Sequence, residues 1–374
     1  MSIQIREAAT RDDLKQWVRF PAQLYGADPY YVPPLFREEL EYFDRTRNPA
    51  FDVCDTRFLL AVRDGHVAGR LCVIVNRLET DKLGYRRGRF GWFDSVDDPT
   101  VANALLGEGS KWLRQLGCTE MTGPHGFGDL DPEGLLVEGF DALPTISGYY
   151  NAPYYQRLLE DFGFEKDADY LEYRFAVPER VPFLERMAKR NARQPDGFRV
   201  HTCGSRKELR EKVSGVWAIL EAAFAPLYGV VPLTEAQTEF YTRKYFGMLD
   251  PDFVKLVYSH DGRLVAFFAA MPNLSEAFRK AGGRLLPFGF WHILRAMRRP
   301  ETVDFLLAGA LPGLPTGQLT AIGLAHMFDT LRARGVRYVE TNRELEENKT
   351  VNQLWSRFDI LHTRRSRVYR LGLD

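Results

Sequence analysis

The sequence has little of the features that mark several specialised classes of protein. Its 374 residues contain only four cysteines, Cys54, Cys72, Cys118 and Cys203, and no Cys-x-x-Cys pair. Neither a zinc site nor a disulfide framework is indicated, and we expect no metal. Lysine plus arginine and aspartate plus glutamate both total 50, so the net charge is zero. This balance argues against a nucleic-acid partner.

Long apolar runs are absent as well. No uncharged apolar run approaches the ~18 residues of a transmembrane helix. The N-terminus, MSIQIREAATRDD, has no apolar signal segment, so we expect a protein of the reducing cytoplasm. An apolar content of 45% and a charged content of 27% are typical of globular proteins. The length suggests two domains.

The chain contains an internal repeat. Asp64-Gly65 and Asp261-Gly262 each lie between two β-rich runs, FLLAVRDGHVAGRLCVIV and FVKLVYSHDGRLVAFFAA, which predicts two hairpins. The segments Leu158–Phe162 and Leu354–Phe358 repeat at nearly the same spacing. A constant spacing across two anchors indicates a duplication. We predict an N-terminal half over 1–178, a polar linker over 179–197 and a C-terminal half over 198–374.

Each half has the same predicted order: a strand, helices, a hairpin, a strand, a helix, a strand, a helix and a strand. In the second half a strand over 302–307 enters a Gly/Pro turn, and a helix follows from about 318 to 334 with Thr316 as its N-cap. A strand over 336–340 and a helix over 350–358 complete the unit. A turn that opens onto a helix without an early acid favours an anion, because the first N–H groups are unsatisfied.

This arrangement resembles the cofactor half of GNAT acyltransferases and predicts a tandem duplicated GNAT fold, of the mixed α/β class. The turn LPGLPTGQL keeps Gly313 and Gly317. It lacks the Arg and the second close glycine of the family's Gln/Arg-x-x-Gly-x-Gly pattern, and Trp355 replaces the usual tyrosine of the last helix. The resemblance implies acyl-CoA as a substrate, with its pyrophosphate on the turn. The expected cofactor-binding residues are Leu311, Gly313, Thr316, Gly317, Gln318, Leu319 and Asn348.

The two halves differ at the turn. The first half enters its helix through FDSVDDPTVANALL, where Asp97 or Asp98 caps the helix. Good capping is a sufficient reason for these acids, but two carboxylates would also repel a pyrophosphate. We therefore place acyl-CoA in the second half.

Four residues are candidates for the catalytic chemistry, in which a base takes a proton from the amine. Glu340, at the end of a strand, is the expected base, and a solvated charge is the alternative. Asn342 and Asn348 are expected to position the substrate, or to cap the last helix. Asp94 shares a strand face with Phe90 and Trp92, which makes it a second base or a structural acid. His125 begins a long loop and is either catalytic or incidental.

An insertion in the second half, SEAFRKAGGRLLPFGFWHILRAMRRPE, predicts an amphipathic helix with arginines opposite an apolar face. Such a helix lies on a membrane surface or packs on the core. Phe290, Trp291, Ile293, Leu294 and Met297 form the apolar face, and His292, Arg295 and Arg299 lie opposite.

Together with this insertion, DDPTVANALLGEGSKWL and the segment from EGLLVEGFD to YYNAPYYQRLLEDFGF resemble the bacterial ceramide synthase-like GNAT proteins. The resemblance implies transfer of a long-chain acyl group from acyl-CoA to the amine of a sphingoid base. We expect a cytoplasmic enzyme, peripheral to the inner membrane and attached to anionic lipid through Leu285–Arg299. Three alternatives stay open. They are an acetyltransferase for a soluble amine, an aminoacyl-tRNA-dependent transferase, which zero net charge disfavours, and a non-catalytic acyl-CoA or lipid-binding protein.

Overall fold

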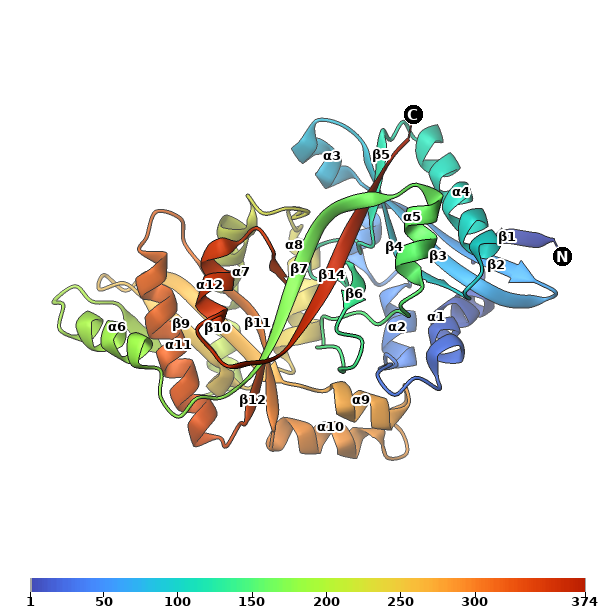
Figure 1. Ribbon diagram of the computed structural model, residues 1–374. Coiled ribbons are helices and arrows are strands. Elements are labelled where there is room, and N and C mark those ends of the chain that lie inside the picture. The colour runs from blue at the N-terminus through green and yellow to red at the C-terminus, as the bar shows by residue number, and fades with distance from the viewer. Residues whose placement is uncertain (1, 374) are drawn as a thin grey trace.

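A computed structural model describes residues 2–373 as helices packed on one 14-stranded sheet (Figure 1). The first half supplies strands β1 Ile3–Glu7, β2 Cys54–Arg63, β3 His66–Asn76, β4 Arg87–Ser95, β5 Glu120–Gly123, β6 Leu135–Glu138 and β7 Glu165–Ala176. Its helices are α1 Arg11–Tyr25, α2 Phe36–Tyr42, α3 Arg77–Leu83, α4 Pro99–Gln115 and α5 Tyr155–Phe162.

The second half repeats this order after helix α6, Pro182–Ala192. Its strands are β8 Arg199–His201, β9 Val254–Tyr258, β10 Leu264–Pro272, β11 Thr302–Ala310, β12 Tyr338–Thr341, β13 Glu344–Leu345 and β14 Ile360–Gly372. Its helices are α7 Arg206–Phe224, α8 Glu235–Tyr241, α9 Ser275–Ala281, α10 Gly289–Arg298, α11 Thr316–Ala333 and α12 Lys349–Trp355.

The order of the strands shows the duplication. The sheet runs β1-β2-β3-β4-β5-β14-β7-β12-β11-β10-β9-β8, so its two arms mirror each other about a central pair. In each arm one pair is parallel, β4 with β5 and β11 with β12, and the other pairs along this order are antiparallel. The predicted mixed α/β fold of two GNAT-like copies is therefore confirmed.

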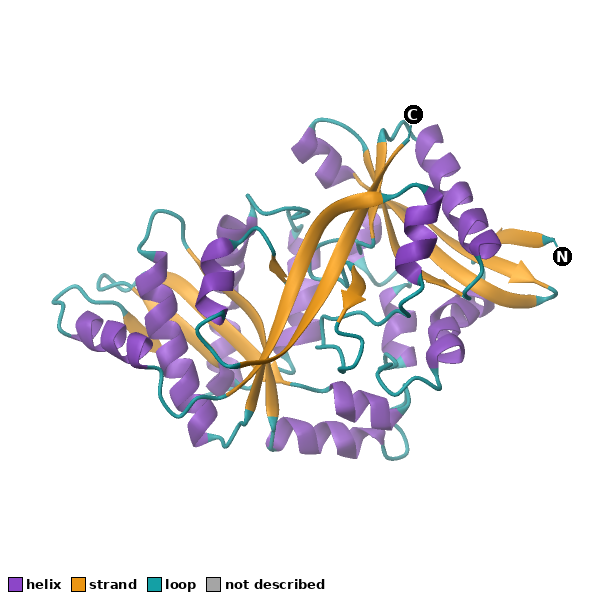
Figure 2. Cartoon of the chain, in the orientation of Figure 1, coloured by secondary structure: helices purple, strands orange, loops and turns teal. Residues whose placement is uncertain are grey.

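The halves exchange their last strands. Strand β14 of the second half pairs with β5 of the first, and β7 of the first half pairs with β12 of the second. These two long strands pair with each other and form the diagonal ribbon that joins the arms in Figure 2. Each half is thus completed by backbone hydrogen bonds from the other, which ties the two copies into one sheet.

Both predicted hairpins are present. Strands β2 and β3 turn at Asp64 and Gly65, whose φ angles are 51° and 78°. Asp and Gly tolerate the left-handed conformation that a tight hairpin requires. Strands β9 and β10 turn through Asp261 and Gly262, where Gly262 has a φ of 86°.

The segment predicted as a polar linker contains a packed helix. Helix α6 lies along α11 and buries Leu184 and Asn191. At one end of the pair Arg332 donates to the carbonyl of Pro178, and at the other Gln318 donates to Asn191. The two helices therefore run in opposite directions, and the end of α6 meets the start of α11.

The insertion forms α9 and α10 at the lower edge of Figure 1, and it corrects the predicted apolar face. Ile293 and Met297 pack against the core, whereas Trp291 and Leu294 are exposed. The apolar residues cover a wide part of the helix surface, so some of them face the core and others face outward. A helical wheel places all of them on one face. None of the described helices is long and apolar enough to cross a membrane.

Candidate active site

Strands β11 and β12 diverge at the centre of the second half. They pair from Thr302 with Tyr338 to Phe305 with Thr341 and then separate. A bulge in β11 lies at the same level, because Ala269 and Ala270 of β10 pair with Leu307 and Phe305. Asn342 spans the opening, since its Nδ2 donates to the carbonyl of Leu306 at 2.7 Å. Its Oδ1 accepts from Ser147 Oγ at 2.7 Å, so this amide holds the opening in shape.

The expected phosphate-binding turn, Leu311–Leu319, comprises the connection after β11 and the first residues of α11. No side chain caps α11, whose N-cap is Pro315 rather than the predicted Thr316. The expectation that the first N–H groups of this helix are unsatisfied holds only in part, because those of Gln318 and Leu319 donate to the carbonyl of Pro315. The N–H of Gly317 makes no backbone hydrogen bond of this kind within residues 2–373. A Cβ built on Gly317 would meet nothing within 4 Å, so the helix start is open.

Two other expected cofactor residues have structural contacts. The N–H of Leu311 donates to Val265 at 2.9 Å, which extends the β10–β11 pairing into the turn. Asn348 caps α12 by accepting from Val351 at 3.4 Å, and it also lines the cavity described below.

The matching helix start in the first half is closed. Asp98 caps α4 by accepting from the N–H of Thr100 at 2.8 Å, and Arg63 forms an ion pair with it. These contacts, led by the hydrogen bond of Thr100, lower the pKa of Asp98. Asp97 pairs with Arg157. A carboxylate already occupies the place where an anion would bind.

Asp94 lies in the interior of the first half. Its side chain is fully buried and accepts from Arg70 at 2.6 Å, Tyr25 at 3.0 Å and Tyr149 at 2.8 Å. Arg70 also stacks on the ring of Trp17. The buried acid has the partners that a charge in the interior requires, and it does not line the cavity.

A cavity of about 970 Å³ lies between the two halves and reaches the opening between β11 and β12 at Leu307 and Asn342. Helix α7 and the segment that follows it form an apolar wall. Residues of both halves form the polar part. The apolar wall contains Val213, Trp217, Ala218, Leu220, Phe224, Leu227, Val230, Val231 and Leu233.

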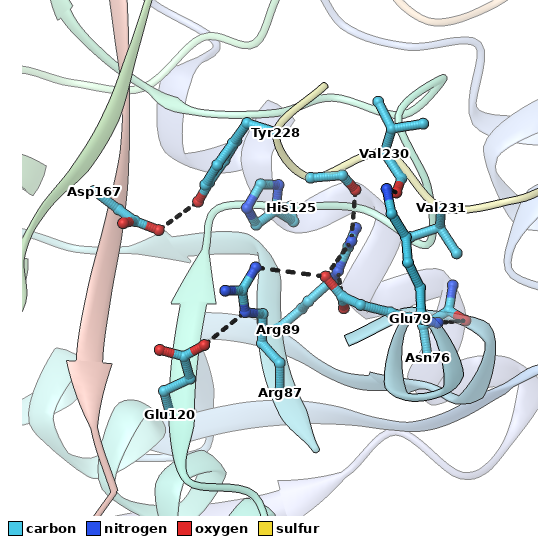
Figure 3. A network of polar contacts seen from close by, with 12 residues as sticks. Asn76, Glu79, Arg87, Arg89, Glu120, His125, Asp167, Tyr228, Val230 and Val231 are labelled. Carbon is cyan, nitrogen blue, oxygen red and sulfur yellow. Dashed lines mark hydrogen bonds and ion pairs between the residues drawn. The ribbon is translucent and has the colours of Figure 1, made fainter. Parts of the chain in front are cut away.

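The first half anchors the segment 225–231 of this wall. Lys82 Nζ donates to the carbonyls of Ala225 and Val230 at 2.8 Å. Arg89, which is held by Glu79 at 2.7 Å, donates to the carbonyl of Gly229. These contacts fix a wall of the second half's cavity through side chains of the first (Figure 3).

His125 belongs to the polar part of this interface. It is buried, lies beside Tyr228 in Figure 3, and places Nδ1 3.0 Å from Glu133. Tyr170 donates to the same carboxylate at 2.8 Å. Burial opposes the ionisation of Glu133, but the charge of His125 and the hydrogen bonds lower its pKa to about 2. Glu133 is among the residues that line the cavity, and His125 is not, although it contacts this carboxylate.

Two acids that line the cavity, Glu344 and Asp129, were not predicted as catalytic residues from the sequence. Burial raises the pKa of Glu344 to about 7, and burial together with Glu133 raises the pKa of Asp129. Glu344 has no ion-pair partner within residues 2–373. It follows Glu340 and Asn342 at two-residue spacing and begins the short strand β13, and this spacing could have identified it.

Glu340, the expected base, lies outside the cavity lining. It is buried, pairs with Arg174 at 2.6 Å and is in register with Asp304 on β11. Burial and the nearby Glu340 raise the pKa of Asp304 to about 8. The assignment of Glu340 as the base stays a prediction, and Glu344 is a second candidate for the same role.

One group in the described part of the chain has metal-ligand chemistry, formed by His201, Cys203 and Glu208. Glu208 accepts from His201 at 2.6 Å and from the N–H of Gly204 at 2.8 Å. These two contacts give the Glu208 carboxylate a structural role at the start of α7.

Comparisons with known proteins agree with this architecture. No family model matches the chain. It is 28% identical over 374 residues to a protein named bacterial ceramide synthase from Caulobacter vibrioides, covering 97% of this chain and 96% of that protein. It is also 28% identical to Protein YghO of Escherichia coli, covering 98% and 94%.

Among solved structures, a tandem GNAT protein from the clavulanic acid biosynthesis pathway matches with a TM-score of 0.56 and 14% identity, over 100% and 99% of the two chains. A GCN5-related N-acetyltransferase from Sphaerobacter thermophilus matches with a TM-score of 0.51 and 15% identity, over 99% and 96%. The chain therefore has the tandem GNAT fold, and over nearly its whole length it resembles a protein named bacterial ceramide synthase, as its sequence motifs indicate.

Proposed function

We propose that this protein is an acyl-CoA-dependent N-acyltransferase that transfers a long-chain acyl group to the amine of a sphingoid base. The cavity carries the proposal, because its lining combines the opening between β11 and β12, an apolar wall and carboxylates that include Glu133 and Glu344. An apolar wall suits an alkyl chain, and carboxylates suit an ammonium group. The similarity to a protein named bacterial ceramide synthase supports the same choice of substrate.

The reaction needs a base and a positioned thioester. The sphingoid ammonium gives a proton to a carboxylate, and the free amine attacks the thioester carbonyl. The C–N bond forms, the C–S bond breaks, and the thiolate of coenzyme A leaves with a proton. Glu344 suits the first step, because it lines the cavity and burial raises its pKa to about 7. Glu340 is the second candidate, because burial raises its pKa although Arg174 opposes this, but it lies outside the cavity lining.

A substrate matrix tests the proposal. Purified protein is given palmitoyl-CoA or acetyl-CoA, each with sphinganine, 3-ketosphinganine or a soluble polyamine. We expect thiol release and an amide product only with the long acyl chain and a sphingoid base. Turnover of acetyl-CoA with the polyamine would replace the proposal with a soluble-amine acetyltransferase. Binding of palmitoyl-CoA without product from any acceptor would indicate a non-catalytic protein.

We further propose that the enzyme lies on the cytoplasmic face of the inner membrane and binds anionic lipid through residues 285–299. Large exposed apolar side chains gather here and form the apolar patch, defined as Leu285, Leu286, Phe288, Trp291 and Leu294. Exposed arginines surround it at Arg284, Arg295, Arg298 and Arg299. Apolar burial and attraction to anionic headgroups act together on such a surface. A lipid amine would then be taken from the bilayer rather than from water.

A further inference from the structure

We propose that the helix joining the two halves, α6, binds the phosphate groups of coenzyme A through Arg186, Lys189, Arg190 and Arg193. This inference rests on the proposed function, because it adds a binding surface to the same cofactor site. It assigns a role in coenzyme A binding to a segment that the sequence marks only as a linker.

The position of α6 is the first argument. Gln318, in the first turn of α11, donates from Nε2 to Asn191 Oδ1 and to Gln194 Oε1, both at 3.0 Å. The end of α6 therefore touches the helix start where the N–H of Gly317 is open. Asn191 is buried and also binds Phe198 through both ends of its amide, which fixes the end of α6.

The charge of α6 is the second argument. Four cations, Arg186, Lys189, Arg190 and Arg193, line one hollow of about 400 Å³ together with Gln194. They recur at three- and four-residue spacing, so they lie on one face of the helix. None of the four makes an ion pair within residues 2–373, whereas Glu185 on the same helix is held by Arg180.

The third argument is that the phosphate-binding turn has no positive charge of its own. Leu311–Leu319 contains no charged residue, and the N–H groups of Gln318 and Leu319 are already used within the helix start. Coenzyme A carries a pyrophosphate and a 3′-phosphate, which are strongly anionic. One open helix start gives only a partial positive charge. The exposed cations of α6 line a hollow with Gln194, which Gln318 of the helix start contacts, and in this inference they supply the missing charge.

Binding of two nucleotides tests the inference. Coenzyme A and 3′-dephospho-coenzyme A are titrated by calorimetry into the wild-type protein, an Arg190→Ala/Arg193→Ala variant and a Lys111→Ala control. A charge-assisted hydrogen bond contributes roughly 1.5–3 kcal/mol, so we expect the double variant to bind coenzyme A at least tenfold more weakly. The control removes an exposed cation from α4 of the first half and should bind as the wild type does.

The second nucleotide identifies the phosphate. If the loss is confined to coenzyme A, α6 binds the 3′-phosphate, and if both nucleotides lose affinity, it binds the pyrophosphate. An unchanged affinity in the double variant overturns the inference, even when the wild type turns over palmitoyl-CoA. A wild-type protein that binds neither nucleotide would contradict the proposed function itself.

A lipid headgroup is the other source of phosphate. The same proteins are therefore tested on vesicles of phosphatidylglycerol and phosphatidylcholine. We expect the double variant to bind vesicles as the wild type does. Loss of vesicle binding with an unchanged affinity for coenzyme A would show that α6 contacts lipid, which contradicts the inference.

Discussion

The apolar patch on α10 and the connection that precedes it gives the prediction that the structure supports in most detail. The change is a triple variant, Leu286→Ser, Phe288→Ser and Trp291→Ser. These side chains are 75%, 70% and 60% exposed, so serine at these positions leaves the core intact. Full burial of a large apolar side chain is worth about 1.5–3 kcal/mol. Three side chains that enter the interface only in part would together contribute about 3 kcal/mol, or roughly a 100-fold change in partitioning.

Vesicle sedimentation measures this change. We expect the triple variant to bind vesicles with 30% phosphatidylglycerol roughly 100-fold more weakly, at an unchanged melting temperature. A Leu361→Ser variant, which alters an exposed side chain on β14, should bind as the wild type does. High salt should weaken wild-type binding as well, because each arginine near the surface contributes about 1 kcal/mol through electrostatic attraction. Full binding by the triple variant would refute the proposed membrane contact.

Three further predictions concern the site and its support. The activity should rise with pH through about 7, because Glu344 must lose its proton to act as base, and Glu344→Gln should abolish this limb of the rate profile while Glu340→Gln keeps it. Gly317→Asp, which fits the open helix start, should weaken acyl-CoA binding tenfold or more in calorimetry, whereas Asp98→Asn should leave it unchanged. Arg70→Met should lower the free energy of unfolding by about 3–5 kcal/mol in urea, because it leaves Asp94 buried without its cation.

Local patterns in the sequence were sufficient for much of the fold. The Asp-Gly turns at Asp64 and Asp261 require a left-handed backbone that few other residue pairs accept, so both hairpins could be located. The strand and helix around the phosphate-binding turn were also predicted within a few residues. The divergence of β11 and β12 follows from the GNAT arrangement, which the Gly/Pro turn identified.

Features that depend on contacts between distant segments could not be predicted. Strands β7 and β14 have similar patterns, and nothing local decides that each completes the other half. The direction of Trp291 and Ile293 on α10 depends on where the core lies, which a helical wheel does not contain. The cavity could not be predicted for the same reason, because its wall and its acids come from both halves.

The residues that line the candidate site were predicted only in part. Asn342 lies at the opening of β11 and β12, as its position after a strand suggested. Glu340 lies on β12 and Glu344 begins the next strand, β13, so the two acids are close in the sequence, and only their burial and partners separate them. Glu340 has an arginine 2.6 Å away, whereas Glu344 faces the cavity. The choice between the two acids therefore depends on which charged side chains lie near each of them, and the sequence alone does not show this.

The most direct test of the proposed reaction is the mass of its product. The protein is incubated with palmitoyl-CoA and deuterium-labelled sphinganine, and the lipids are analysed by mass spectrometry alongside free coenzyme A. We predict a labelled N-palmitoyl sphinganine that accumulates in equal amount with the released thiol and depends on Glu344. Release of coenzyme A without the labelled amide, or no reaction with any sphingoid base, would contradict the account.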